Sequence, residues 1–185
     1  MLTRDERLEL LRVARGAIAH ALSAGLPPAP PRVGNPALRA GAFVSVHLHG
    51  DLRGCIGHLG TTQVLADVVA ECAVAAATRD PRFASLRPDE LTDVRLEISV
   101  LGPVEPVSDV TAIEIGRHGL MVEQGFLRGL LLPQVATEQG WGREVFLAHT
   151  CLKAGLKADA WKSGARISRF EAEVFGEEIG SPPAA

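Results

Sequence analysis

The sequence predicts an α+β fold, because strand-like and helix-like patterns occupy separate stretches of the chain. Apolar and polar residues alternate over 42–49 and over 94–100, which is typical of strands with one buried face. Apolar residues recur instead at helical spacing from residue 3 to Gly25 and again up to about Thr78. Tight turns between the strands indicate antiparallel hairpins, with the helices outside them.

The first helix is predicted to begin after Thr3 and to end at Gly25. Thr3 and Glu6 match a capping box, in which two side chains bond to the backbone at the start of a helix. The predicted inward stripe of this helix is Leu8, Leu11, Arg15, Ile18 and Leu22. The prolines of 27–36 exclude helix and central strand, so we expect an ordered connection there.

The stretch 42–57 is predicted to be a hairpin that turns at 49–51. A two-residue loop would set Leu48 against a charged residue. A three-residue loop pairs Leu48 with Leu52 and keeps one face apolar, so this is the predicted register. Ser45 then lies opposite Cys55, and His47 opposite Arg53. The other face therefore carries four polar side chains: Ser45, His47, Arg53 and Cys55.

The second helix is predicted to be capped by Thr61 or Thr62 and to bury Cys72. The remaining predicted elements are a loop over 80–93 with a turn near Pro88, strands at 113–115, 120–122, 127–132 and 166–175, a helix over 133–139, and a helix that buries Val145, Ala148 and Leu152 and ends at Gly155.

The composition is that of a one-domain chain without a dominant charge. The chain has 185 residues, a net charge of −3 and a pI of about 6.1, so no domain-wide basic surface for nucleic acid is predicted. The three cysteines are far apart and form no C-x-x-C pair, which indicates free thiols. The charged N-terminus and the lack of an apolar run of about 20 residues predict a cytoplasmic protein.

One short stretch, Leu52-Arg53-Gly54-Cys55-Ile56-Gly57, combines a reactive residue type with space around it. Gly54 and Gly57 leave room for another backbone or a ligand on either side of the sulfur. A guanidinium near a thiol favours the nucleophilic thiolate, which makes Arg53 a candidate thiolate stabiliser. The alternative is a strand cysteine that only packs in the core.

The same stretch is one of five blocks that resemble the AMMECR domain family, called protein A of the AmmeMemoRadiSam system in prokaryotes. The other blocks are DPRF at 80–83, GRHGL at 116–120, LLPQVA at 131–136 and KAGL at 153–156. The resemblance implies one domain, 1–176, of two intertwined lobes built on antiparallel sheets, with a cleft near 52–58 and a loose tail at 177–185. It also implies two companions, a radical SAM protein and a Memo-like protein, but no settled activity.

The resemblance adds site residues outside the hairpin. His118 stands in the family's G-x-H-G block and is the candidate acid or base for Cys55, unless it only holds its own turn. Arg82, in the DPRF block, would bind an anion, unless it only pairs with Asp80. Ser45 matches a family position that carries a hydroxyl. The predicted catalytic residues are thus Cys55 and His118, and the predicted substrate-binding residues are Ser45, Arg53, Gly54, Gly57, Asp80 and Arg82.

These residues favour a cysteine-dependent enzyme that acts on a small anionic or nucleotide-like group and works with the two companion proteins. The alternative is a non-catalytic module of the same system that binds a peptide or a nucleic acid. A weaker alternative is a metal-binding accessory protein that uses His47 and His49. No cofactor and no metal are predicted, and the sequence contains no P-loop or dinucleotide-binding fingerprint.

Overall fold

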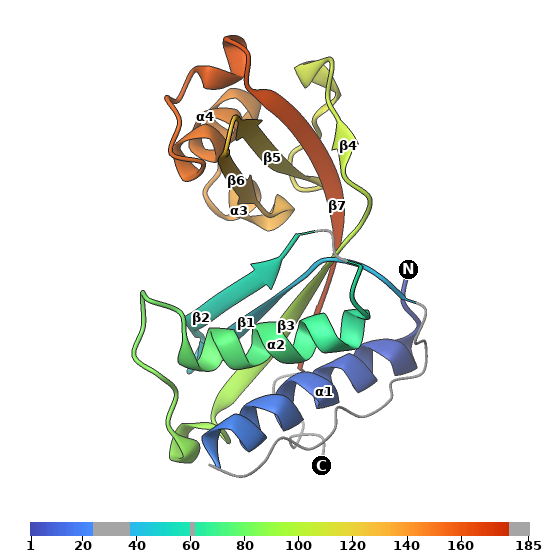
Figure 1. Ribbon diagram of the computed structural model, residues 1–185, viewed down its shortest axis with the longest axis vertical. Helices are drawn as coiled ribbons and strands as arrows, with labels where there is room; N and C mark the ends of the chain where they lie inside the picture. The colour runs from blue at the N-terminus through green and yellow to red at the C-terminus, as the bar shows by residue number, and fades with distance from the viewer. Residues whose placement is uncertain (24–37, 60–61, 178–185) are drawn as a thin grey trace. The chain divides into compact units, whose positions relative to one another are not determined.

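The computed structural model describes residues 1–23, 38–59 and 62–177, and Figure 1 shows its helices and strands. The chain forms two compact units, one of residues 1–101 with 173–185 and one of residues 102–172. Both units combine helices with antiparallel strands, which confirms the predicted α+β class. The predicted proline-rich connection and residues 178–185 of the predicted tail lie outside the described residues. The first residue of that predicted tail, Glu177, is not loose, because its carboxylate accepts hydrogen bonds from Arg15 and from the Leu96 N–H.

The first unit is a sheet with two helices on one face. Its strand order is β2 (Asp51–His58), β1 (Ala42–Leu48), β3 (Val94–Leu101) and the end of β7 (Arg166–Gly176). Helices α1 (Arg4–Leu22) and α2 (Leu65–Thr78) lie along the same face of this sheet (Figure 1). The core between helices and sheet includes Ile18, Val44, Val46, Val68, Cys72, Leu96 and Ile98. The predicted burial of Cys72 is confirmed.

Helix α1 begins with the predicted capping box. The Thr3 hydroxyl accepts a hydrogen bond from the Glu6 N–H at 3.3 Å, and the Glu6 carboxylate accepts one from the Thr3 N–H at 2.8 Å. Arg15 is buried, as its place in the predicted stripe requires, and its Nε donates to the Glu177 carboxylate at 2.7 Å. Leu8 is exposed, so the predicted stripe is wrong at that position.

Helix α2 begins at Leu65 and is not capped by a threonine. Its N-cap residue is Val64, whose side chain forms no capping bond. Val64 instead pairs with Arg39 in an antiparallel β-bridge, so backbone pairing fixes the segment that leads into the helix. The predicted cap at Thr61 or Thr62 is therefore wrong.

The β1–β2 hairpin keeps the predicted register at the cysteine and departs from it at the turn. Ser45 lies opposite Cys55, as predicted. Leu48, however, pairs with Asp51 and not with Leu52. The loop therefore has two residues, and the predicted three-residue loop is wrong.

A positive-φ turn and a β-bulge explain this difference. The turn residues His49 and Gly50 have φ angles of 54° and 95°, the left-handed conformation that two-residue hairpin loops require. His47 then lies opposite Leu52, and Arg53 is the extra residue of a bulge in β2. The predicted pairing of His47 with Arg53 is wrong, because the bulge takes Arg53 out of the ladder.

The second unit is a smaller sheet with its own core. Strands β6 (Leu127–Leu131), β5 (His118–Gln124) and the first part of β7 lie side by side, and β4 (Glu105–Pro106) pairs with the far edge of β7. Helices α3 (Pro133–Glu138) and α4 (Arg143–Lys153) contribute to this core, and Gly155 at φ 77° follows α4 as predicted. The buried residues include Ile113, Leu120, Val122, Phe146, Leu147 and Cys151.

Two predictions for this unit are wrong. The stretch 113–115 is not a strand: a short 3-10 turn, Val110–Ala112, precedes it, and Ile113 points into the core as a loop residue. Helix α4 buries Phe146 and Leu147, whereas Val145 and Leu152 of the predicted stripe are exposed. The larger aromatic side chain of Phe146 occupies the core, so a different face of α4 points inward from the one predicted.

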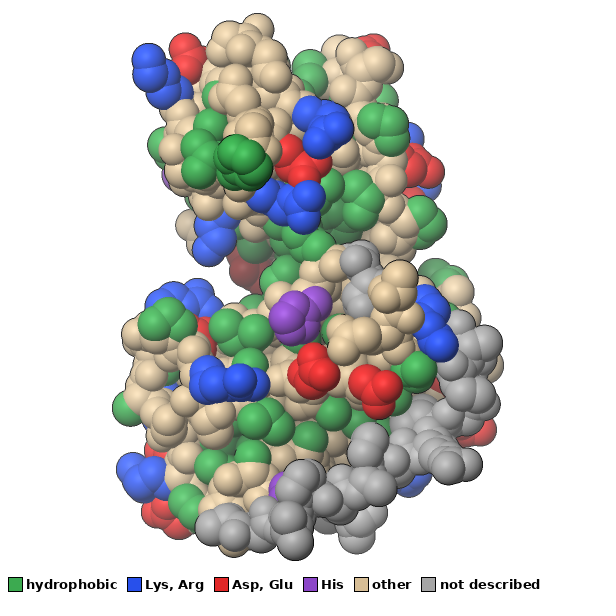
Figure 2. Space-filling model, in the orientation of Figure 1, with side chains coloured by type: hydrophobic (Ala, Val, Ile, Leu, Met, Phe, Trp, Pro, Cys, Tyr) green, Lys and Arg blue, Asp and Glu red, His purple; other side chains and the backbone are tan. Residues whose placement is uncertain are grey.

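The described helices do not have the features of a membrane span. None of them combines the length and the hydropathy that crossing a bilayer requires. Figure 2 shows one side of the surface, on which basic side chains are scattered among acidic and apolar ones. This distribution agrees with the net charge of −3.

Candidate functional site

Cys55 lies on the face of the first sheet that is opposite the helices. Its neighbour Gly54 faces α2, and side chains alternate along a strand, so Cys55 points to the other face. Ser45 on β1 is its cross-strand partner, and the Ser45 hydroxyl donates to the sulfur at 3.4 Å. Cys55 is half-buried, whereas Cys72 and Cys151 are fully buried. Among the three thiols, Cys55 is therefore the one that solvent can reach.

Asp80 and Arg82 hold the backbone of Cys55 from outside the sheet. The Cys55 N–H donates to the Asp80 carboxylate at 2.9 Å, and Arg82 Nη2 donates to the Cys55 carbonyl at 3.3 Å. Strand β2 is an edge strand, so these groups would otherwise lack a partner strand. The loop after α2 thus supplies side chains in place of a neighbouring strand, and it fixes the position of the thiol.

The Asp80–Arg82 pair is a two-point contact between a buried acid and a half-exposed base. Arg82 Nε and Nη2 donate to the two carboxylate oxygens at 3.0 and 2.7 Å. The Asp80 side chain is 2 % exposed and that of Arg82 is 52 % exposed. The hydrogen bonds from Arg82 hold the pKa of Asp80 well below its usual range. Arg82 Nη1 has no partner among the described residues and remains free to bind an anion.

The surroundings of Cys55 favour the neutral thiol over the thiolate. Burial raises the pKa of Cys55, and the nearby carboxylates of Asp80 and Glu97 raise it further. The hydrogen bond from Ser45 and the positive charge of Arg82 act in the opposite direction but are outweighed. At neutral pH, Cys55 therefore carries its proton.

Arg53 contacts a loop and not the thiol. Its guanidinium donates to the Ala84 carbonyl and, at 3.5 Å, to the Ser85 carbonyl, and it lies 4.0 Å from the Glu90 carboxylate. The guanidinium that lowers the pKa of Cys55 belongs to Arg82. The predicted role of Arg53 as thiolate stabiliser thus has no support in its contacts, since the bulge directs this side chain to the loop.

The two glycines of the motif allow close packing inside the protein. A Cβ on Gly54 would lie 2.0 Å from the Ala76 carbonyl oxygen of α2, so the helix backbone occupies that space. A Cβ on Gly57 would lie 2.3 Å from the Phe43 ring, which covers this glycine on the open face. The predicted close approach of another backbone is confirmed at Gly54. A ligand-binding role for Gly54 and Gly57 stays a prediction.

His118 begins strand β5 in the second unit and is 4 % exposed. Its Nδ1 accepts a hydrogen bond from the Glu114 N–H at 2.9 Å, so it holds the turn before the strand, which was the alternative prediction. Burial, followed by the positive charge of Arg169, lowers the pKa of His118, and the ring is neutral at neutral pH. Cys55 and His118 lie in different units, so their catalytic pairing stays a prediction.

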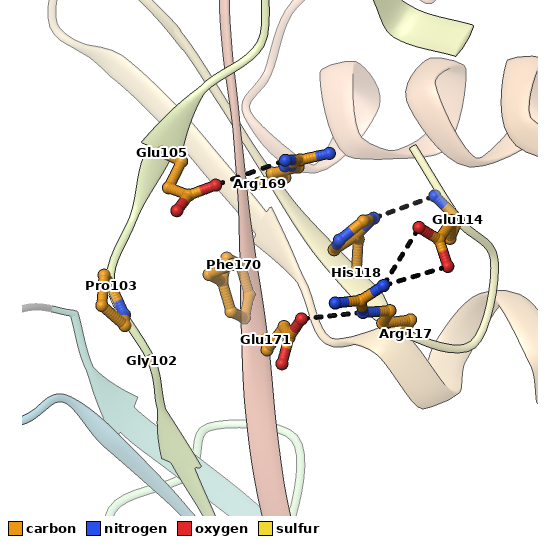
Figure 3. Close-up of a pocket in the computed structure, with 9 residues that line it drawn as sticks. All are labelled: Gly102, Pro103, Glu105, Glu114, Arg117, His118, Arg169, Phe170 and Glu171. Carbon is orange, nitrogen blue, oxygen red and sulfur yellow. Dashed lines mark hydrogen bonds and ion pairs between the residues drawn. The ribbon is translucent and has the colours of Figure 1, made fainter. Parts of the chain in front are cut away.

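A pocket of about 430 Å³ surrounds His118 within the second unit (Figure 3). Arg117 spans part of its rim: its Nε donates to Glu171 at 2.7 Å and its Nη1 to Glu114 at 3.2 Å. Arg169 donates to the Ala112 carbonyl at 2.8 Å and, weakly, to Glu105 at 3.4 Å. The lining residues are Gly102, Pro103, Glu105, Glu114, Arg117, His118, Arg169, Phe170 and Glu171.

Sequence reasoning found His118 but missed the rest of this pocket. The signal for part of it is the alternation in the last strand, where Arg169 and Glu171 flank an apolar Phe170. Their pairing with β5 brings Glu171 opposite His118. That pairing is a long-range contact, which motif spacing does not reveal.

A metal-binding role finds no site in the described residues. Within 1–23, 38–59 and 62–177, no group of three or more His, Cys, Asp or Glu side chains is placed to hold a metal ion. His47 lies in strand β1, but His49 is a turn residue with positive φ. The two histidines therefore do not follow the strand alternation on which the HxH prediction depended.

The protein is therefore an α+β protein with antiparallel sheets and one half-buried cysteine, whose backbone is hydrogen-bonded by an aspartate and an arginine. The AMMECR1 family model matches residues 11–175, and the chain belongs to this family.

Several archaeal proteins are similar to this chain. A protein of Methanothermobacter thermautotrophicus is 45% identical over 188 residues, which cover 96% of this chain and 97% of that protein. A protein of Thermococcus gammatolerans is 42% identical over 187 residues, covering 94% and 91%. The crystal structure of an uncharacterized protein from Pyrococcus horikoshii has a TM-score of 0.86 at 38% identity, covering 94% of this chain and 91% of that chain.

Proposed function

We propose that the open sheet face around Cys55 binds a small anionic, nucleotide-like group, and that Cys55 meets this ligand as a neutral thiol. The observation that carries the proposal is the half-buried Cys55, whose sulfur accepts a hydrogen bond from the Ser45 hydroxyl and whose carbonyl accepts one from the half-exposed Arg82 guanidinium. Arg82 Nη1 offers N–H groups that no described residue uses. A phosphate or carboxylate takes hydrogen bonds from such a group readily.

Phe43 supports the nucleotide-like part of the proposal. Its ring lies over Gly57, on the same sheet face as Ser45 and Cys55, and is half-buried. An aromatic ring on an open sheet face is a surface on which a base stacks. The scattered charge of the visible surface favours a small ligand over a long nucleic acid, which needs many phosphate contacts.

A cysteine-dependent enzyme is the second candidate. The hydrogen bond from Ser45 to the sulfur and the accessibility of Cys55 favour it. The raised pKa of Cys55 disfavours it, because an enzyme of this kind needs a base or a preformed thiolate. In that case His118 would be the acid or base, and the radical SAM and Memo-like companions would supply or consume the substrate.

The first test is alkylation of the native protein across pH, with the three cysteines resolved by peptide mass spectrometry. We expect Cys55 to react with a midpoint above the ~8.5 of a free thiol, because its pKa is raised. Cys72, whose pKa is raised to about 11 by burial, should stay protected until the protein unfolds. A midpoint of Cys55 below ~7.5 would support the enzyme instead, and an inert Cys55 would overturn both candidates.

Ser45→Ala is the matched variant for this test. The Ser45 hydrogen bond lowers the pKa of Cys55, so its removal should move the alkylation midpoint to still higher pH. Thr78→Ser, in which the hydroxyl bonds to Val74 within α2, is the control and should leave the midpoint unchanged. An unchanged midpoint in Ser45→Ala would show that the hydroxyl does not act on the sulfur.

The second test is protection of Cys55 by ligands. Adenosine monophosphate should slow the alkylation of Cys55 at millimolar concentration more than adenosine or inorganic phosphate alone, because it offers both a base and an anion. Arg82→Lys keeps the positive charge but loses the paired N–H donors of the guanidinium, so it should reduce this protection. Equal rates of Cys55 alkylation with and without the nucleotide would contradict the proposed nucleotide-like ligand. The pH midpoint of alkylation tests separately whether Cys55 is a neutral thiol.

A further inference from the structure

We propose that the pocket around His118 binds a small zwitterionic molecule that carries one carboxylate and one amino group. The pocket lies within the second unit, on β5, β7 and the segments that lead into β4 and β5. The anion-binding proposal for the sheet face around Cys55 uses none of these residues, so this inference does not rest on it.

The pocket has the volume of a ligand site. Its volume of about 430 Å³ lies within the roughly 300–1,000 Å³ that is common for small-molecule sites. Two buried residues, His118 and Phe170, form part of its lining, and the Phe170 ring packs over Gly119. The charged side chains of Glu105, Arg117 and Glu171 are exposed. A ligand would therefore meet buried lining residues and exposed charged ones.

His118 presents an unused donor to this pocket. Its Nδ1 accepts the bond from Glu114, so the proton of the neutral ring is on Nε2. No described residue accepts a hydrogen bond from that Nε2–H. Figure 3 shows the ring between Glu114 and Phe170, with the second nitrogen on the side away from Glu114. Because none of the described residues accepts it, this N–H is open to a ligand that brings a hydrogen-bond acceptor into the pocket.

Arg169 makes a carboxylate the fitting acceptor. It lines the same pocket, and the shorter of its two hydrogen bonds, at 2.8 Å, goes to the Ala112 carbonyl. Its contact with Glu105 is 3.4 Å, which a better-placed carboxylate would outcompete. Arg169 lies two residues before Glu171, the cross-strand partner of His118, so strand alternation places Arg169 and His118 on the same face of the sheet. Together they offer a charge and a donor to one carboxylate.

The net charge of the lining favours a cation on the same ligand. Three glutamates and two arginines line the pocket and His118 is neutral, which leaves one excess negative charge. A simple anion would bind against this excess, and a simple cation would use neither Arg169 nor the His118 N–H. A zwitterion satisfies both, with its amino group near Glu105 or Glu171 and its carboxylate near Arg169.

Three probes that share one carbon chain test this inference: ε-aminocaproate, caproate and hexylamine. Isothermal titration with the full chain should give a Kd for ε-aminocaproate at least about tenfold below that of either analogue. Proton–nitrogen spectra of the histidine rings should show the His118 Nε2 signal shift with ε-aminocaproate. Equal affinity for all three probes, or no binding at millimolar concentration, would overturn the proposal.

Rim variants locate the site without disturbing the buried lining. Arg169→Gln and Glu105→Gln should each weaken ε-aminocaproate binding by about tenfold. The control is Arg128→Gln, because Arg128 pairs with Glu123 outside the pocket. Binding that is lost equally in Arg128→Gln, or retained in both rim variants, would place the probe elsewhere and contradict the inference.

Discussion

Replacing Asp80 with asparagine is expected to lower the free energy of unfolding by about 2–3 kcal/mol at pH 7. The carboxylate is buried and accepts four hydrogen bonds, from the N–H of Cys55 and from the N–H, Nε and Nη2 of Arg82. Asparagine retains one acceptor oxygen and turns an amide toward the guanidinium. The half-exposed Arg82 is screened by solvent, which keeps the loss at the lower end for a buried pair.

The same substitution should remove part of the acid sensitivity of the protein. The pKa of Asp80 is held below its usual range in the folded state, so the folded state binds the proton more weakly than the unfolded state. The stabilisation is therefore complete above the unfolded pKa of about 3.9 and is lost as the pH falls below it. Urea unfolding between about pH 5 and pH 2.5 should show a flatter pH dependence in Asp80→Asn than in the unchanged protein.

Asp89→Asn is the control, because the chain repeats the arrangement on the same loop in an exposed form. Asp89 pairs with Arg87 at the same sequence spacing, but its side chain is 71 % exposed. Exposed pairs contribute little, so the change should stay within about 0.5 kcal/mol. If both variants lose the same stability, burial is not what gives the Asp80 pair its strength.

Gly54→Ala is expected to destabilise the first unit by about 3 kcal/mol or more. The added Cβ would lie 2.0 Å from the Ala76 carbonyl oxygen and 2.9 Å from the carbonyl carbon, both of them backbone atoms. A backbone atom inside α2 cannot rotate away as a side chain does. The helix or the strand must therefore shift, and the fully buried residues between them lose packing.

Gly16→Ala provides a control of opposite sign. Gly16 lies within α1, and a Cβ there would have no heavy atom within 4 Å. Alanine is the better helix former, so this variant should gain up to about 1 kcal/mol. Denaturant unfolding of the two variants measures both effects. A Gly54→Ala protein as stable as the unchanged one would show that α2 does not lie against β2 at this point.

Local signals predicted much of the fold correctly. The capping box at Thr3, the alternation of β3 and the glycine after α4 each depend on neighbouring residues, and each is confirmed. The errors arise where distant residues decide. Val145 and Phe146 are both apolar neighbours on α4, and only the shape of the core determines that Phe146 is buried.

The candidate site was likewise predicted only in part. The pairing of Ser45 with Cys55 was predicted from a three-residue loop and is confirmed, although a two-residue loop and the bulge at Arg53 produce it. The contact of Arg53 could not be predicted, because a single bulge residue redirects its side chain to the loop at Ala84. The role of Asp80 as an acceptor for the Cys55 N–H depends on a loop 25 residues away, which neither spacing nor composition reveals.

Strand β7 imposes an order on the synthesis of this chain. Residues 102–172 are consecutive, so a ribosome completes the second unit before it delivers residues 173–177, the last part of the first. Until then β3 has an open edge, and Arg15 lacks the Glu177 carboxylate that lies 162 positions further on. The half of the protein that contains the N-terminus is therefore the half that must wait longest to close.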